Sequence, residues 1–161
     1  MEDASGRWRL TPLAPELAEA DFAAFYPIRQ RLRQELGWNG WPPDDFDVVA
    51  NIDDLAKHYA EFERREAYAY SLFSAERCIG CIYIEPWEGG AQLHFWVIDA
   101  WLPQEPIILE SVLRWLEAWP FDEVIVPVRP QVRRMHDRAA ELGLTTCDGP
   151  EGFISYRRPP S

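Results

Sequence analysis

The 161-residue chain is poor in cysteine, in long apolar runs and in positive charge, and each shortage excludes a class of protein. Its three cysteines are too few and too unevenly spaced for the disulfide framework of a small secreted domain. No apolar run approaches the roughly 20 residues that cross a bilayer. Residues 1–9 are too polar and charged for a signal peptide. We therefore expect a soluble, cytoplasmic protein that does not bind membranes.

Positive charge is scarce, because 16 Lys and Arg residues stand against 27 Asp and Glu residues, for a formal charge of −11. This balance argues against nucleic acid as a partner. Acidic residues gather early in the chain, at Asp44, Asp45, Asp47, Asp53 and Asp54. Four arginines gather late, at Arg129, Arg133, Arg134 and Arg138. Solvated surface would explain both groups, but the arginines also form a candidate anion-facing patch.

The sequence CIGC at residues 78–81 has the C-x-x-C spacing of redox and zinc sites. A redox pair needs a helix N-terminus that lowers a thiol pKa, and zinc needs a second pair of ligands. Neither accompanies these residues. We therefore interpret Cys78 and Cys81 as core cysteines and predict no metal site.

Large apolar residues are plentiful. The chain is 47% hydrophobic and has eight Trp, eight Phe and six Tyr residues. A chain of this length buries about 70% of the surface that its unfolded form exposes. We therefore predict a single domain over residues 1–161 that folds without disulfides.

Residues 67–99 organise the predicted fold. They read as three strands, over residues 68–73, 78–85 and 92–99, each rich in aromatic and β-branched side chains. The breaks between them are short enough to join antiparallel neighbours, which predicts a three-stranded meander. The second and third strands are apolar on both faces, which predicts helices on both sides of the sheet.

The flanking segments alternate between strands and helices. Further strands are predicted over residues 7–13, 123–129 and 153–157. Helices are predicted from Pro15 to Gly37 with a break at Pro27, and over residues 51–65, 107–119 and 131–142. The helix between residues 99 and 123 makes a crossover connection. The two strands that it joins should therefore be parallel neighbours.

Three local features give more detailed expectations. Asn51 is the predicted N-cap of the second long helix, and His58 on that helix is predicted to be solvated. The apolar side of the helix follows a helical spacing through Ile52, Leu55, Ala56, Tyr59 and Phe62. Pro127 lies inside a predicted strand and has no N–H to donate, which favours an edge or bulged position.

This order of elements resembles that of the GNAT superfamily of acyl-CoA-dependent N-acyltransferases. The resemblance extends from Trp8 to Tyr156 and includes the strand HFWVID, at residues 94–99, with the loop and helix after it. It also includes RMHDRAAELGL, at residues 134–144, which is similar to the family's terminal helix and its Gly-containing turn. The resemblance implies an α/β (α+β) fold with a central mixed, mostly antiparallel sheet, a splayed pair of parallel strands and helices on both faces.

The resemblance also implies acetyl-CoA or another acyl-CoA as the cofactor, held where the parallel strands splay apart. Pantetheine amides would pair with backbone groups of Trp96, Val97 and Ile98. The family's pyrophosphate site is a Gly-rich loop at a helix N-terminus, but residues 101–106, WLPQEP, contain two prolines and no glycine. Backbone N–H groups and guanidinium groups remain as candidate donors, from Leu102, Gln104, Arg133 and Arg134.

Proton transfer is the chemistry that such an enzyme must supply. The tyrosine that serves as the acid in many members is replaced by Ala139. The remaining candidate catalytic residues are His94, Glu85, Tyr83 and Asp99. The imidazole of His94 has a suitable pKa for taking a proton from an ammonium group or a water, although a hydrogen-bonded structural histidine is the alternative. Glu85 and Asp99 close two of the strands, and Tyr83 would replace the missing acid if it points into the cleft.

Trp38 and Trp41 lie in the loop over residues 37–47 and are candidates for the wall of an acceptor site, with simple packing as the alternative. The acidic stretch over residues 44–54 would suit a cationic amine. The resemblance thus implies acetyl transfer to a primary amine of a small molecule or peptide. The alternative is a catalytically inactive GNAT-fold module that binds a ligand or a protein partner. The sequence leaves the oligomeric state open, a homodimer included.

Overall fold

A meander of three long strands forms the centre of the sheet, as predicted. In the computed structural model, which describes residues 1–38, 40–88 and 90–159, these strands are β2 (Tyr68–Ser74), β3 (Arg77–Trp87) and β4 (Gly90–Val97). They pair antiparallel, with Ala69 opposite Tyr83 and Tyr83 opposite His94. Aromatic and aliphatic side chains on both faces bury the meander between helices.

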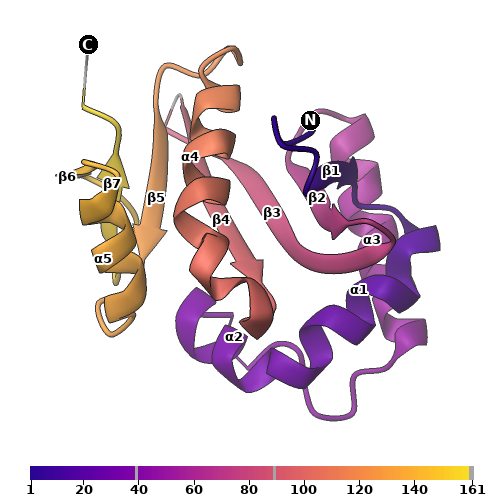
Figure 1. Cartoon of the computed structure of the whole chain (residues 1–161). Coiled ribbons are helices and arrows are strands. Elements are labelled where there is room, and N and C mark those ends of the chain that lie inside the picture. Colours follow the sequence, from indigo (N-terminus) through magenta and orange to yellow (C-terminus); the bar gives the residue numbers. More distant parts are fainter. Residues whose placement is uncertain (39, 89, 160–161) are drawn as a thin grey trace.

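Four shorter strands extend the meander on both sides to a seven-stranded sheet in the order β1-β2-β3-β4-β5-β7-β6 (Figure 1). They are β1 (Arg9–Pro12), β5 (Val124–Val128), β6 (Thr145–Cys147) and β7 (Ile154–Arg157). β6 has three residues and was not predicted, because so short a strand has no alternation to recognise. The sheet is mixed, with β4 and β5 as its parallel pair.

The parallel pair splays apart, which confirms the predicted crossover. Ala91 of β4 pairs with Val124 of β5, and Gln92 pairs with Ile125. The two strands separate beyond these residues. Pro127 lies after that point. It is therefore in an interior strand, not in the edge or bulged position that we predicted, and it pairs with Ser155 of β7. Because β4 has already diverged there, the missing N–H of proline removes no bond between β4 and β5.

In the part of the chain that the structure describes, five α-helices surround the sheet: α1 (Ala18–Phe25), α2 (Arg29–Leu36), α3 (Val48–Glu63), α4 (Glu105–Leu116) and α5 (Arg133–Glu141). The predicted break at Pro27 is a short 3₁₀ helix, and α2 ends at Gly37 with a left-handed φ of 71°. On one face of the sheet Trp115 of α4 contacts Tyr70, and on the other Phe25 of α1 contacts Trp96. None of the described helices has the length and apolar character that a membrane crossing needs.

The start and the orientation of α3 differ from the sequence prediction. Asp47 is the N-cap, and its carboxylate accepts a hydrogen bond from the backbone N–H of Ala50 at 2.8 Å. Asn51 instead lies inside the helix and is fully buried. The helix is also rotated relative to its apolar pattern, because Ile52 and Tyr59 are exposed. The inward face therefore carries polar residues at positions 51, 54 and 58.

Candidate active site

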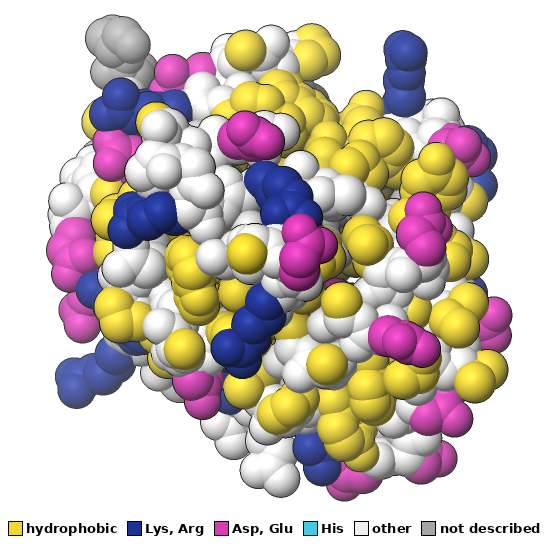
Figure 2. Space-filling model, turned by 45° about the vertical axis from the view of Figure 1, so that its right-hand side comes forward, with side chains coloured by type: hydrophobic (Ala, Val, Ile, Leu, Met, Phe, Trp, Pro, Cys, Tyr) yellow, Lys and Arg dark blue, Asp and Glu magenta, His cyan; other side chains and the backbone are white. Residues whose placement is uncertain are grey.

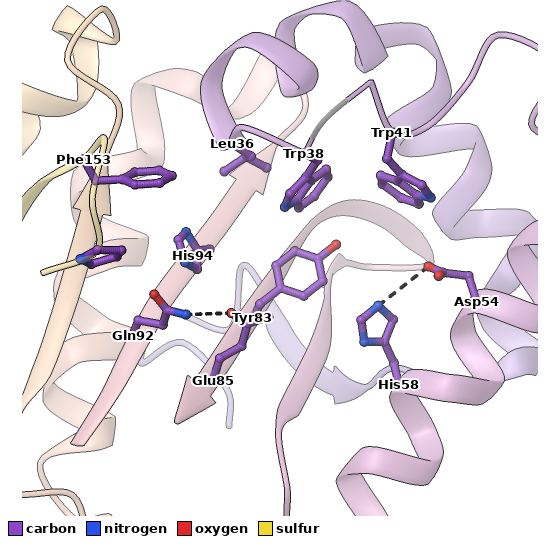
Figure 3. Close-up of a pocket in the computed structure, with 11 residues that line it drawn as sticks. Leu36, Trp38, Trp41, Asp54, His58, Tyr83, Glu85, Gln92, His94 and Phe153 are labelled. Carbon is purple, nitrogen blue, oxygen red and sulfur yellow. Dashed lines mark hydrogen bonds and ion pairs between the residues drawn. The ribbon is translucent and has the colours of Figure 1, made fainter. Parts of the chain in front are cut away.

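A cavity of about 540 Å³ opens on the face of the sheet that α3 covers (Figure 3). Its walls come from β3, β4, α3, the segment after α2 and the segment before β7. Five residues predicted from the sequence meet there: Trp38, Trp41, Tyr83, Glu85 and His94. The other lining residues are Leu36, Asp54, His58, Gln92, Pro150 and Phe153. Residues far apart in the sequence thus form one hollow.

The floor of the cavity is made by side chains from the two central strands. Tyr83 lies opposite His94 and Glu85 opposite Gln92, so the alternation of strand side chains directs all four to the same face. The side-chain amide of Gln92 donates to the Glu85 carboxylate at 3.0 Å (Figure 3). Burial raises the pKa of Glu85, and the hydrogen bond from Gln92 partly offsets this. Glu85 is thus a partly desolvated carboxylate in the cavity wall.

Aromatic rings make up the wall beside Tyr83. The Trp38 ring lies perpendicular to the Tyr83 ring, with centroids 5.5 Å apart, and 5.0 Å from the ring of Trp41. Trp96 donates its indole N–H to the Tyr83 hydroxyl oxygen at 3.2 Å. Burial keeps the pKa of Tyr83 well above its usual value. Its hydroxyl is therefore protonated at physiological pH, and burial makes it a weaker acid than an exposed tyrosine.

His94 occupies the junction of two openings. It lines the cavity, and it also lines a narrow slit between the diverging strands β4 and β5. Burial lowers the pKa of His94 to about 4, so the imidazole is neutral at pH 7 and has a free lone pair, but it is a weaker base than an exposed histidine. The ring of Phe153 lies 6.3 Å away, on the β7 side (Figure 3).

Two residues of α3 lie in the cavity wall: His58, which was not predicted as a site residue, and Asp54, which was predicted only as the end of the acidic stretch over residues 44–54. The His58 imidazole lies 3.6 Å from the Asp54 carboxylate, and its other nitrogen lies 3.5 Å from Glu61 (Figure 3). Burial raises the pKa of Asp54. His58 was predicted to be solvated because the apolar pattern of the helix placed it on the outer face. Polar residues at the spacing of positions 51, 54 and 58 were the available signal of a polar inward face.

The slit between β4 and β5 is the place where the sequence predicted the cofactor arm. Its volume of about 30 Å³ has room for a few waters at most. Backbone groups along β4 alternate in direction, and the Ala91 amide donates to Glu123 on the β5 side. The same alternation directs the backbone of Phe95 and Val97 toward the slit. The Val97 carbonyl accepts from Arg31 at 2.6 Å.

The alternation separates the three predicted backbone positions. The Ile98 amide donates to the Ile79 carbonyl of β3 at 2.8 Å, on the side away from the slit. The Trp96 carbonyl also lies against β3, next to Gly80. The backbone of Phe95, which was not predicted, faces the slit side, and Phe95 and Trp96 both line the slit. Phe95 could have been predicted if the direction of the backbone N–H of one residue of β4, toward β3 or toward β5, had been known.

The anion end of the predicted cofactor site is a 3₁₀ helix, Asp99–Gln104, that leads into α4. It contains Leu102 and Gln104. Asp99 lies outside the cavity lining, with its largely exposed carboxylate 3.1 Å from Arg31. Arg133 is exposed at the start of α5. On the face shown in Figure 2, basic side chains lie among acidic ones and do not form a separate patch.

Arg134 bridges the slit. Its guanidinium donates to Glu35 of α2 at 2.9 Å and to Glu105 of α4 at 2.8 Å. Arg138 lies 3.8 Å from the same Glu105 carboxylate. The two arginines are therefore already balanced by carboxylates, and a bound phosphate would compete with Glu35 and Glu105 for Arg134.

No protein-family model matches the chain, and no curated protein matches it in sequence. Solved structures of acetyltransferases match its fold. The apo structure of RimL, a ribosomal L7/L12 α-N-protein acetyltransferase, has a TM-score of 0.77 over 96% of this chain and 90% of that chain, at 12% identity. The chain has the GNAT fold. An acetyltransferase from Salmonella typhimurium that modifies the N-terminal serine of L7/L12 matches 96% of both chains, with a TM-score of 0.76 and 13% identity.

A third structure of the GNAT fold, the microcin C7 self-immunity acetyltransferase MccE, was solved with acetyl-CoA and AMP. It has a TM-score of 0.70 and 10% identity, and it covers 93% of this chain and 91% of that chain. In the GNAT fold of the present chain, the splayed strands put the slit and the cavity side by side. Within the described ranges, no group of three or more His, Cys, Asp or Glu side chains is placed to hold a metal ion. Cys78 and Cys81 are buried, and burial raises the pKa of Cys78 to about 12.

Proposed function

We propose that this protein is an acyl-CoA-dependent N-acyltransferase that transfers an acyl group, such as acetyl, to a primary amine of a small molecule or peptide. The position of His94 carries the proposal, because this neutral base lines both the cavity and the slit. The acetyltransferases that share the fold support it. When bound, an acyl-CoA would supply an activated thioester, and transfer to the amine would yield an amide and a free thiol.

The residues around the slit suit such a cofactor in part. The backbone groups of Phe95, which lines the slit beyond the last pairing of β4 with β5, would pair with amides of the pantetheine arm. The Val97 carbonyl would join them only if Arg31, which now donates to it, moved away. Leu102 and Gln104 would offer backbone donors to the phosphates, and Arg133 and Arg134 would offer guanidinium groups. The slit must widen to admit the arm, since it now has room only for water.

The proton transfers are assigned to two residues of the cavity floor. His94 would accept the proton that the amine loses as it attacks, because its imidazole is neutral and adjoins the slit. Tyr83 would donate a proton to the departing sulfur, for which its protonated hydroxyl is available, although burial makes it a weaker acid than an exposed tyrosine. Glu85 would attract the ammonium form of the amine. We assign no proton transfer to Asp99, which lies outside the cavity lining and pairs with Arg31.

A catalytically inactive ligand-binding module is the second candidate function. The narrow slit, closed by the contacts of Arg134 with Glu35 and Glu105, favours it. The proline-containing segment before α4, which has no glycine nest for phosphates, also favours it. A module of this kind would bind amines in the cavity and would not take up CoA.

The deciding experiment measures two quantities with the full chain: the affinity for CoA by calorimetric titration, and the transfer of acetyl from acetyl-CoA to a panel of primary amines by mass spectrometry. Mass spectrometry avoids thiol reagents, which would react with the partly exposed Cys147. An active parent protein should lose about 10²-fold or more in kcat when His94 is changed to Gln. Asp53→Asn, on the outer face of α3, is the control that should keep full activity. Absence of CoA binding by the parent protein would refute the enzyme and favour the binding module.

A further inference from the structure

The charge of the cavity wall is one-sided. Its described lining residues include two carboxylates, Asp54 and Glu85, and no lysine or arginine. Both carboxylates are partly desolvated, since burial raises the pKa of each. Glu61 adds further negative charge behind His58, at 3.5 Å from its ring nitrogen. A cation bound between these groups would stabilise their ionised form, whereas an anion would be repelled.

The rest of the wall is aromatic. The ring of Trp38 stands nearly perpendicular to the rings of Trp41 and Tyr83, with interplanar angles of 78° and 90°. Figure 3 shows these rings on one side of the cavity and Phe153 on the other, with His94 between them. Such an arrangement offers flat apolar surface to a ligand from two directions. It also offers ring faces that attract a cation.

The positions of the acidic and aromatic groups relative to His94 set the orientation of a ligand. Glu85 and His94 are diagonal neighbours on adjacent strands, since Tyr83 pairs with His94 and Glu85 with Gln92. An ammonium group held by Glu85 therefore lies beside the imidazole that adjoins the slit. The remainder of the molecule then extends toward the tryptophans after α2.

We propose that the acceptor is a primary amine with a single positive charge and an aromatic or branched apolar body. Its ammonium group lies between Glu85 and His94, and its body lies against Trp38 and Trp41. An amine that also carries a carboxylate, such as a free amino acid, is rejected by Asp54 and Glu85. This inference rests on the proposed function and names its acceptor class. The source of the amine is either a small molecule or the N-terminus of a peptide that begins with an apolar residue.

The test is a calorimetric titration of the full chain, without acyl-CoA, with three probes of similar size and different charge and a fourth, larger probe that carries the same charge as the first. They are 2-phenylethylamine, its neutral analogue 2-phenylethanol, the zwitterion phenylalanine, and a tripeptide amide with N-terminal phenylalanine. We expect 2-phenylethylamine to bind at least about tenfold more tightly than the alcohol and the zwitterion. Tighter binding of the tripeptide amide would identify a peptide N-terminus as the source. Tighter binding of 2-phenylethylamine would identify a small molecule.

Variants separate charge from packing. Glu85→Gln should weaken the binding of 2-phenylethylamine by about tenfold and leave the affinity for 2-phenylethanol unchanged, because the neutral alcohol forms no ion pair with the carboxylate. Trp38→Ala should weaken the binding of both the amine and the alcohol, because both lose the same aromatic contact. Glu117→Gln, a substitution of an exposed carboxylate at the end of α4, is the matched control and should change neither. Circular dichroism of each variant confirms that it is folded.

Equal affinity for the amine and the alcohol would overturn the inference, and so would no amine binding at about 10 mM. The two proposals fail separately. Amine binding without acetyl transfer would refute the acyltransferase and keep the acceptor site. Acetyl transfer to polyamines or acidic peptides, without binding of 2-phenylethylamine, would keep the enzyme and refute this acceptor class.

Discussion

The guanidinium of Arg134 holds the Glu105 carboxylate through two hydrogen bonds, of 2.8 and 3.2 Å, and Glu105 is only 2% exposed. The carboxylate lies in the first turn of α4 and the guanidinium in the first turn of α5. Hydrogen bonds to Glu35 and Glu105 raise the pKa of Arg134. A buried carboxylate that loses its cation is costly, because few solvent contacts replace the lost ones.

Arg134→Ala should therefore lower the free energy of unfolding by about 3 kcal/mol. Arg138 remains at 3.8 Å from Glu105 and limits the loss. Arg133→Ala, one residue earlier at an exposed position, is the matched control and should change stability by no more than about 0.5 kcal/mol. Urea unfolding of both variants measures the difference. Similar effects of the two substitutions would show that the bridge contributes little to stability.

The buried pair Asp21 and Asn51 predicts how stability depends on pH. The Asn51 amide donates to the Asp21 carboxyl at 3.0 Å, and burial raises the pKa of Asp21 to about 7. The folded protein therefore holds this proton more tightly than the unfolded chain, whose aspartate pKa is about 3.9. The contribution to stability is fully present below about pH 4 and is lost as the pH rises to about 7. The loss amounts to about 4 kcal/mol at most.

Asp21→Asn should remove this dependence, since an amide does not titrate. The variant should be more stable than the parent at pH 8, and the difference should shrink as the pH falls toward 4. Asp53→Asn, a substitution at an exposed position of α3, should leave the pH dependence unchanged. Urea unfolding at several pH values is the measurement. The assignment would be contradicted if the free energy of unfolding changed by the same amount between pH 4 and pH 7 in the parent protein and in Asp21→Asn.

Tyr83→Phe tests the proposed acid without disturbing the aromatic wall. The ring keeps its contact with Trp38, while the hydroxyl is lost along with its bond from Trp96. We expect kcat for acetyl transfer to fall by about 10²-fold with little change in KM for the amine. Tyr59→Phe, at an exposed position of α3, is the matched control. An unchanged kcat in Tyr83→Phe would remove Tyr83 from the mechanism.

Gly80→Ala tests the close packing of β3 against β4. A Cβ atom at position 80 would lie 2.2 Å from the Trp96 carbonyl oxygen, which is far below contact distance. Strand backbone cannot move aside as a flexible side chain can, so the substitution should cost about 1–3 kcal/mol or more of stability. Thermal unfolding of the variant measures this cost. A loss below about 0.5 kcal/mol would mean that the strands separate there without strain.

The sheet was predictable because its signals are local. The aromatic and β-branched strands of the meander and the short turns between them follow from consecutive residues, and the crossover to β5 follows from one apolar helix. Asn51 shows where local reasoning ends. Both Asp47 and Asn51 are good capping residues, and the choice depends on Asp21, which lies in another helix. No neighbouring residue in the sequence records that contact.

The candidate site was predicted in part for the same reason. Tyr83, Glu85 and His94 were candidates because of their chemistry, and the register of β3 with β4 directs them to one face, but the role of α3 was misread. Its most apolar stripe includes Ile52 and Tyr59, which are 42% and 38% exposed. A helix that faces a polar cavity must direct polar side chains inward, against its own hydrophobic pattern. A hydrophobic pattern that disagrees with the observed burial of side chains is expected at a functional site.

The narrow pairing of β4 with β5 has a consequence for motion. Among the described residues, only two of β4 pair with two of β5, and Pro127 has no backbone N–H that could extend this pairing. Beyond that seam β5, β7 and β6 pair only with one another in the described part of the chain, and α5 belongs to the same segment. Such a segment is expected to open as a unit at a lower free energy than the whole molecule, and native-state hydrogen exchange would record it. A long, flexible ligand would then be admitted by partial opening of the C-terminal segment, and no preformed tunnel would be required.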